Sequence, residues 1–187
     1  MGGWNPSQYL KYAGPRLRPA IDLIERAARA LDAAPAPGAV FDLGCGTGNT
    51  TRLLAEHWPA AAVTGVDSST DMLARARSSD IGASWMEAEL GDWAPPAPPE
   101  TYYDILAPVA RHLEIWESVY LHVLDGDDPV VEWTKATGFR PLLDALDGAQ
   151  RDGLLEDYRA RIAKAYPKRA DGKTLFPFRR LFIVAGR

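Results

Sequence analysis

The chain has 187 residues, of which 47% are apolar and 25% charged, the balance of an ordinary globular domain. A net charge of −4 argues against a general affinity for nucleic acid, and a single cysteine, Cys45, excludes an internal disulfide and a CxxC metal cage. The sequence contains no run of about 20 apolar residues, so we expect a cytoplasmic protein without a membrane partner.

Helical and strand-like patterns alternate in the first half of the chain. Apolar residues at helical spacing predict a first helix from Pro19 to about residue 33, with the proline in its first turn. Three apolar segments predict strands at 39–43, 62–66 and 83–88. A helix capped by Asn49 or Thr50 and ending at about residue 58 follows the first strand, and a helix capped by Ser68 or Ser69 follows the second. This order predicts an α/β fold with a Rossmann-like, doubly wound, mostly parallel sheet.

The regular alternation stops at a proline-rich connector, residues 94–101. The elements predicted after it are a helix at 102–109, a strand at 113–120, helices at 129–138, 141–147 and 149–165, and a strand at 181–185. We expect one domain, 1–187, in which a cofactor-binding half (1–93) is joined by the connector to an acceptor-binding half with a helical C-terminal cap (102–187).

A glycine-rich turn, Asp42-Leu43-Gly44-Cys45-Gly46-Thr47-Gly48, lies where the first strand hands over to a helix. Its glycines allow main chain to approach a ligand closely, and the helix start should present free amide donors. The dinucleotide fingerprint G-x-G-x-x-G is not met, because Gly48 comes one position early and Asn49 stands where a glycine is required. Asp42 suits a cationic group such as an amine better than a pyrophosphate, which disfavours a nicotinamide-dependent oxidoreductase.

Two further acids follow the second and third strands. Asp67 ends the second strand, at the edge where open α/β sheets bind ligands, and its carboxylate can accept both hydroxyls of a ribose. The alternative is an acid that stabilises the next helix start beside Ser68. Glu89 could receive the exocyclic amine of an adenine, although Glu87 and Asp92 compete for that role.

Several segments together resemble the trans-aconitate 2-methyltransferase family of class I S-adenosylmethionine-dependent methyltransferases. They include Trp4-Asn5-Pro6-Ser7-Gln8-Tyr9-Leu10, Arg16-Leu17-Arg18-Pro19-Ala20, Val66-Asp67-Ser68-Ser69, residues 131–141 around Trp133, and Arg180-Leu181-Phe182-Ile183-Val184-Ala185. The resemblance implies S-adenosylmethionine as cofactor and a methyl ester formed on a small polycarboxylate. The cofactor residues would be Asp42, Gly44, Cys45, Gly46, Gly48, Asp67, Ser68 and Glu89.

Arginine forks suit a carboxylate acceptor, and three arginines fall in family-like segments. The acceptor-binding candidates are Trp4, Tyr9, Arg18, Arg140 and Arg180, each arginine having the alternative of an ordinary ion pair. Cys45 can be a reactive thiol at a helix start, but a small filler of the loop is the simpler interpretation. We assign no catalytic residue, and the three histidines show no metal-binding spacing.

The chain departs from the family between Trp93 and Tyr102, where two strand–helix units of about 30 residues each are expected. Their loss removes the fourth and fifth strands and leaves one side of the first strand unpaired. The C-terminal strand could pair there, a second copy of the chain could cover the edge in a homo-oligomer, or residues of the natural protein are missing from this sequence. A catalytically silent relic of a methyltransferase is therefore the rival to an active enzyme.

Overall fold

The computed structural model describes residues 13–30, 36–89, 96–135, 139, 142–143 and 145–186. The chain separates into two compact units. We call residues 13–117 with 181–186 the glycine-loop unit, and residues 118–180 the C-terminal unit.

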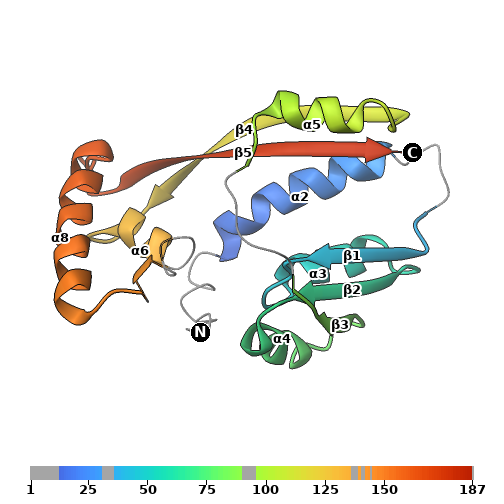
Figure 1. The fold of residues 1–187 in the computed structure, drawn as a ribbon, viewed down its shortest axis with the longest axis horizontal. Helices are drawn as coiled ribbons and strands as arrows, with labels where there is room; N and C mark the ends of the chain where they lie inside the picture. Colours follow the sequence, from blue (N-terminus) through green and yellow to red (C-terminus); the bar gives the residue numbers. More distant parts are fainter. Residues whose placement is uncertain are drawn as a thin grey trace. The chain divides into compact units, whose positions relative to one another are not determined.

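A three-stranded parallel sheet in the order β1-β2-β3 is the centre of the glycine-loop unit (Figure 1). Its strands are β1 (Ala39–Leu43), β2 (Ala62–Asp67) and β3 (Ser84–Glu87). Helix α3 (Asn49–His57) packs on β1 and β2, and α4 (Thr70–Arg77) packs on β2 and β3. The alternation of parallel strands and helices, and hence the α/β class, is confirmed.

The starts of these two helices differ in how they are capped. The α4 cap is Ser69, whose hydroxyl accepts a hydrogen bond from Met72 N at 3.3 Å, one of the two caps expected. The cap of α3 is Gly48, with no side-chain cap, so the prediction of Asn49 or Thr50 is wrong. The physical reason is that Gly48 has φ 82, a conformation that ends the loop and that glycine adopts without steric cost.

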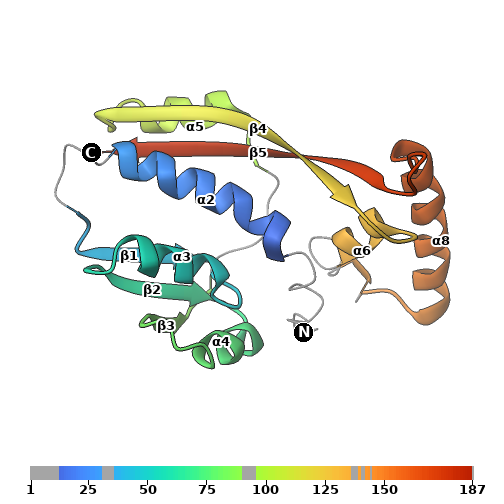
Figure 2. The ribbon, with the colours of Figure 1, turned by 180° about the vertical axis from the view of Figure 1, so that it is seen from behind.

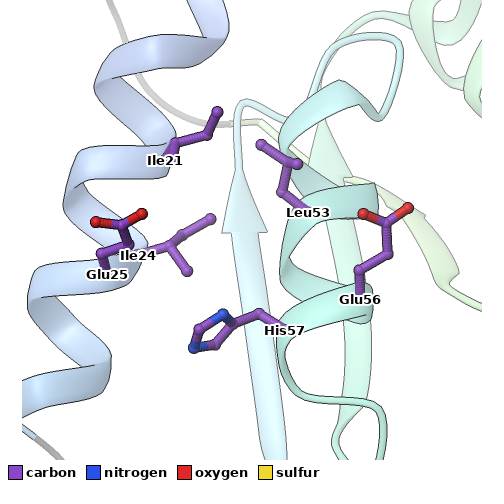
Figure 3. Close-up of a pocket in the computed structure, with 6 residues that line it drawn as sticks. All are labelled: Ile21, Ile24, Glu25, Leu53, Glu56 and His57. Atoms are coloured by element: carbon purple, nitrogen blue, oxygen red, sulfur yellow. The ribbon is translucent and has the colours of Figure 1, made fainter.

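Helix α2 spans Ala13–Ala30 and begins earlier than predicted. Pro19 therefore lies inside the helix and not in its first turn, where it removes one main-chain hydrogen bond. The helix packs on α3, and a shallow groove of about 250 Å³ lies between them, with Ile21, Ile24 and Leu53 forming its apolar part (Figure 3). Arg26 of α2 forms an ion pair with Glu114 of β4.

The two longest strands, β4 (His112–Leu124) and β5 (Thr174–Gly186), pair only with each other among the described strands. Their arrows run in opposite directions (Figure 2). Both strands are longer than predicted. Helix α5 (Pro99–Leu106) begins inside the predicted connector, because Pro99 is tolerated in the first turn of a helix.

The C-terminal unit is built on helices α6 (Pro129–Lys135) and α8 (Gly148–Ala165). A capping box between Asp147 and Gln150 starts α8, as two reciprocal hydrogen bonds of 2.9 and 3.3 Å show. Trp133 is almost fully buried and packs with Leu124, Val130 and Phe176. In the described part of the chain no helix has both the length and the apolar character needed to cross a membrane.

One face of the parallel sheet carries exposed apolar side chains. Phe41 is 60% exposed, Leu43 70% and Met86 47%, whereas α3 and α4 pack against the sheet's residues on its other face. The edge of β1 away from β2 has no strand beside it among the described residues. The C-terminal strand, β5, pairs with β4 and not with β1, so that remedy for the unpaired edge is excluded.

Candidate functional site

Three glycines in left-handed conformations shape the loop between β1 and α3. Gly44 has φ 75, Gly46 has φ 55 and Gly48 has φ 82, values that other residues rarely adopt. The loop's amides are used inside the protein. Gly44 N and Cys45 N donate to Val66 O at 2.8 and 3.0 Å, and Gly48 N donates to Cys45 O at 3.0 Å. Hydrogen bonds to the end of β2 and within the loop thus occupy these three amides, whereas the expectation of free donors concerns the start of α3 and stays a prediction.

Asp67, at the end of β2, ties the loop to the start of α4. Its Oδ2 accepts a hydrogen bond from Gly46 N at 2.8 Å, and its Oδ1 accepts one from Ser69 N at 2.8 Å. The carboxylate is half-buried and faces the glycine loop. Each oxygen keeps a second acceptor position. Asp67 therefore supports the start of α4, which is the alternative interpretation from the sequence, and its role toward a ribose stays a prediction.

Asp42 lies below the loop and is anchored by Thr51 in the first turn of α3. Thr51 Oγ1 donates to Asp42 Oδ2 at 2.7 Å, and the Thr51 main chain donates as well. Burial raises the pKa of Asp42, the hydrogen bond from Thr51 lowers it, and the nearby charge of Asp67 raises it again. The outcome is a raised pKa, because burial and the charge of Asp67 outweigh the hydrogen bonds from Thr51.

Cys45 is buried in the loop. Burial, followed by the charges of Asp42 and Asp67, raises the pKa of its thiol to about 12. Its Sγ lies 3.8 Å from Gly46 O. A thiol with so high a pKa is a poor nucleophile at neutral pH, which favours the interpretation of Cys45 as a filler of the loop.

Trp85 of β3 was not foreseen as part of the site. A Cβ placed on Gly48 would lie 2.5 Å from Trp85 Cη2, and one placed on Gly65 would lie 2.6 Å from Trp85 Cζ3. The indole therefore fills the space that these two glycines leave. The signal for this contact in the sequence was Gly65, because a glycine inside a strand often marks a place where another group approaches the main chain closely.

The other predicted cofactor residues lie around this loop. Ser68 and Glu89 are exposed, and no described hydrogen bond fixes the side chain of either. Glu87, the competitor of Glu89, lies near Thr70, whose hydroxyl donates to Glu87 Oε1 at 3.4 Å. Asp92, the other competitor, lies outside the described residues.

Two of the acceptor-binding candidates lie among the described residues, Arg18 in the glycine-loop unit and Arg180 in the C-terminal unit. Arg18 forms an ion pair with Asp22, one turn along α2, at 2.9 Å, which is the ordinary alternative for that arginine. The guanidinium of Arg180 lies 3.7 Å from the ring centre of Phe178, a cation–π contact in the C-terminal unit. Trp4, Tyr9 and Arg140 lie outside the described residues. In the described part of the chain no cluster of three histidine, cysteine or carboxylate side chains could hold a metal ion.

Known proteins match this chain along its whole length. Trans-aconitate 2-methyltransferase of Afipia carboxidovorans is 35% identical over 261 aligned positions, covering 100% of both chains, and that of Azoarcus sp. is 37% identical over 258, again covering 100% of both. The chain belongs to the trans-aconitate 2-methyltransferase family. A family described as a methyltransferase domain matches residues 40–124. A solved structure of the plantazolicin methyltransferase BpumL in complex with SAH is 16% identical, covers 97% of this chain and 88% of that chain, and has a TM-score of 0.46.

Membership identifies the chain as an S-adenosylmethionine-dependent methyltransferase with a small-molecule acceptor. Its length also differs from that of its relatives. The alignment with the Afipia protein has 261 positions and this chain has 187 residues, so about 74 positions of the alignment have no residue of this chain. This deficit is close in size to the two strand–helix units, about 30 residues each, that the sequence predicts to be missing between Trp93 and Tyr102.

The residues present fit this cofactor. A Cβ placed on Gly46 would meet no atom within 4 Å, so the glycine faces open space that a side chain would fill. Asp67 accepts a hydrogen bond from the amide of Gly46, and a second carboxylate, Asp42, lies at the start of the loop, where burial and the charge of Asp67 raise its pKa. A ligand with an amino group and a ribose is complementary to such a pair.

Proposed function

We propose that this enzyme forms a methyl ester on a carboxylate of trans-aconitate or a similar small polycarboxylate. The relatives bear that acceptor in their names. The cofactor supplies an electrophilic methyl group, and an acceptor carboxylate is already ionised at neutral pH, so the protein needs no general base. The contribution of the chain is then to hold the reactants in line and to exclude water.

In this proposal Asp42 pairs with the cofactor's amino group, Asp67 accepts its ribose hydroxyls, and Gly44, Gly46 and Gly48 give it room. The observation that carries the assignment is the difference between the main-chain amides and the carboxylates at the loop. Four of its amides already donate within the protein, while the carboxylate of Asp67 lies against the loop at Gly46 and that of Asp42 lies at its start, held by Thr51. A pyrophosphate needs amide donors, whereas an amine and a diol need carboxylate acceptors. Cys45, Ser68 and Glu89 complete the proposed cofactor site.

The acceptor side of the proposal rests on cationic side chains. Arg18, Arg140 and Arg180 are proposed to bind the carboxylates, with Trp4 and Tyr9 beside them. Arginine presents two parallel N–H donors to a carboxylate, which gives both attraction and orientation. Leaving its pair with Asp22 costs Arg18 little, because an exposed pair of this kind contributes at most about 1 kcal/mol.

Calorimetry with S-adenosylhomocysteine, together with mass spectrometry of the methyl ester, tests the proposal on protein whose intact mass has been verified. Binding and ester formation are expected. Absence of heat would refute the cofactor site, and binding without ester would support the second candidate, a silent relic. That candidate is favoured by a specific observation, the exposed apolar face around Phe41 and Leu43 in a chain that lacks about 74 positions of the alignment with its relative.

The proposal also includes a cytoplasmic location and a homodimer in which a second copy covers the edge of β1. Main-chain groups at a sheet edge and the apolar side chains of Phe41 and Leu43 favour such pairing. Sedimentation equilibrium of the wild type and of Phe41→Glu tests it. A monomeric wild type, or a dimer that Phe41→Glu leaves intact, would contradict the arrangement.

A further inference from the structure

The indole of Trp85 lies under the glycine loop and touches it from two directions. The Cβ that Gly48 lacks would stand 2.5 Å from Cη2 and 3.2 Å from Cζ3 of the ring. The Cβ that Gly65 lacks would stand 2.6 Å from Cζ3 and 2.7 Å from Cε3. Real Cβ atoms do not approach other atoms so closely, so the ring is in contact with bare main chain on β2 and at the start of α3.

The surroundings of the ring leave it little freedom. Trp85 pairs with Gly65 in the register of β2 and β3, so the two residues share a face of the sheet. The Cβ of Ala76, a fully buried residue of α4, lies 3.5 Å from the position of the missing Gly48 Cβ. Cys45 Sγ lies 3.0 Å from that of Gly65. The ring is half-buried and packs against β2 and the start of α3, with Ala76 of α4 and Cys45 of the loop close to the same two glycines.

Gly65 differs from the loop glycines in one informative way. Its φ is not positive, so alanine is compatible with its main chain, whereas Gly48 has φ 82. The nearest obstacles to a side chain at residue 65 are therefore the indole and the Cys45 sulfur beside it. This makes the Gly65–Trp85 contact separable from backbone strain.

We propose that Trp85 is a positioning residue for the methyl-transfer reaction. Its ring fixes how far the loop at residues 44–48 stands from β2 and β3, and therefore the distance between the loop and the cofactor. The inference rests on the proposed function, because it assumes that the loop holds the cofactor. Trp85 itself acts from beneath the loop, through Gly48 and Cys45. A ring pushed upward or removed shifts Gly46 relative to Asp67, which are joined by a 2.8 Å hydrogen bond.

The test is a double-mutant cycle with Gly65→Ala and Trp85→Leu, measured by calorimetry with S-adenosylhomocysteine. A leucine ends before the positions of Cε3, Cζ3 and Cη2, so it removes the atoms that the new methyl would strike. We expect Gly65→Ala to weaken binding by at least about tenfold, Trp85→Leu by several-fold, and the double variant to bind within about threefold of Trp85→Leu. Such rescue of Gly65→Ala by Trp85→Leu indicates that the two residues are in contact, and not that each substitution damages the fold in general.

Trp116→Leu is the matched control, since Trp116 stacks on Phe182 in the same unit with ring centres 5.0 Å apart, away from the loop. We expect it to lower the melting temperature while leaving the affinity of the folded protein unchanged. Equal affinities for Trp85→Leu and wild type, additive losses in the cycle, or an equal loss in Trp116→Leu would overturn the positioning role. Failure of the wild type to bind would instead refute the proposed cofactor site, so the two failures are distinguishable.

Discussion

Replacement of Asp67 separates its structural role from its proposed role in binding. In the free protein the carboxylate accepts two main-chain hydrogen bonds of 2.8 Å, from Gly46 N and Ser69 N. A hydrogen bond to a charged group contributes about 1.5–3 kcal/mol, and the half-buried site lets water replace part of it. Asp67→Ala should therefore lower the free energy of unfolding by about 2 kcal/mol, less whatever the lost repulsion with Asp42 returns.

The effect on the cofactor should be larger than this stability loss suggests. Two charge-assisted hydrogen bonds to a ribose diol correspond to about 2–4 kcal/mol, which is about 30- to 700-fold in affinity. Asp67→Asn keeps one acceptor oxygen and loses the charge, so it should lie between wild type and Asp67→Ala. Calorimetry with S-adenosylhomocysteine, below the melting temperature of each variant, measures these affinities.

Asp71→Asn is the matched control for this prediction, since Asp71 is an exposed acid in the first turn of α4. It contributes to the helix start through the dipole, worth about 0.3–1 kcal/mol, without touching the glycine loop. We expect its affinity for S-adenosylhomocysteine to equal that of the wild type. If Asp67→Ala and Asp71→Asn bound the ligand equally well, Asp67 would be a helix-start acid and nothing more.

Three further predictions concern the loop itself. The pKa of Asp42 is higher in the folded protein than in the unfolded chain, so its contribution to stability is greatest at low pH and falls as the pH rises through the two values. Asp42→Asn should therefore remove this pH dependence from the free energy of unfolding, measured with urea between pH 4 and 7. The same variant should weaken cofactor binding at pH 7. At pH 8 the thiolate fraction of Cys45, with its pKa of about 12, is about a thousandfold below that of an exposed thiol with a pKa of 9.0. Iodoacetamide should therefore label Cys45 only when the protein is unfolded in urea. Labelling of the native protein would contradict the burial of this side chain. Gly46→Ala should abolish cofactor binding at a modest cost in stability. Gly82, whose φ of 65 is similar and whose missing Cβ would also meet no atom within 4 Å, provides the control: Gly82→Ala should lose the same stability and bind the cofactor normally. Equal binding by both variants would show that the cofactor does not occupy the open side of Gly46.

The elements that carry the proposed site were predictable from the sequence because local patterns determine them. β1 at 39–43 and the cap of α4 follow from an apolar run and a serine, both read within a few residues. The full length of β4 and β5 was not predictable, because a strand's extent depends on its partner and each continues wherever the other does. Pro19 inside α2 shows the same limit, since packing of the helix offsets a poor local preference.

Within the site, the residues with unusual chemistry were predictable and those that act by shape were not. Asp42 and Asp67 stand out as acids at strand ends, and the structure brings both to the loop. Thr51 and Trp85 are ordinary residues of a helix and a strand, and their importance comes only from what lies opposite them in space. The hydrogen bonds of the loop amides were not predictable either, because the carbonyl of Val66, which accepts from Gly44 N and Cys45 N, comes close to them only in the folded chain.

This use of the amides explains how one type of glycine turn can serve ligands of opposite charge. A turn with unpaired N–H groups and the positive end of a helix attracts a phosphate. In this loop the end of β2 and Asp67 take up the N–H groups of Gly44, Cys45 and Gly46, and two half-buried carboxylates, Asp42 and Asp67, lie next to them. Burial raises the pKa of Asp42 most, and the charge of Asp67 raises it further, so the two carboxylates repel each other. A bound ammonium would offset that repulsion, so the same arrangement that costs the free protein stability favours a cationic ligand over an anionic one.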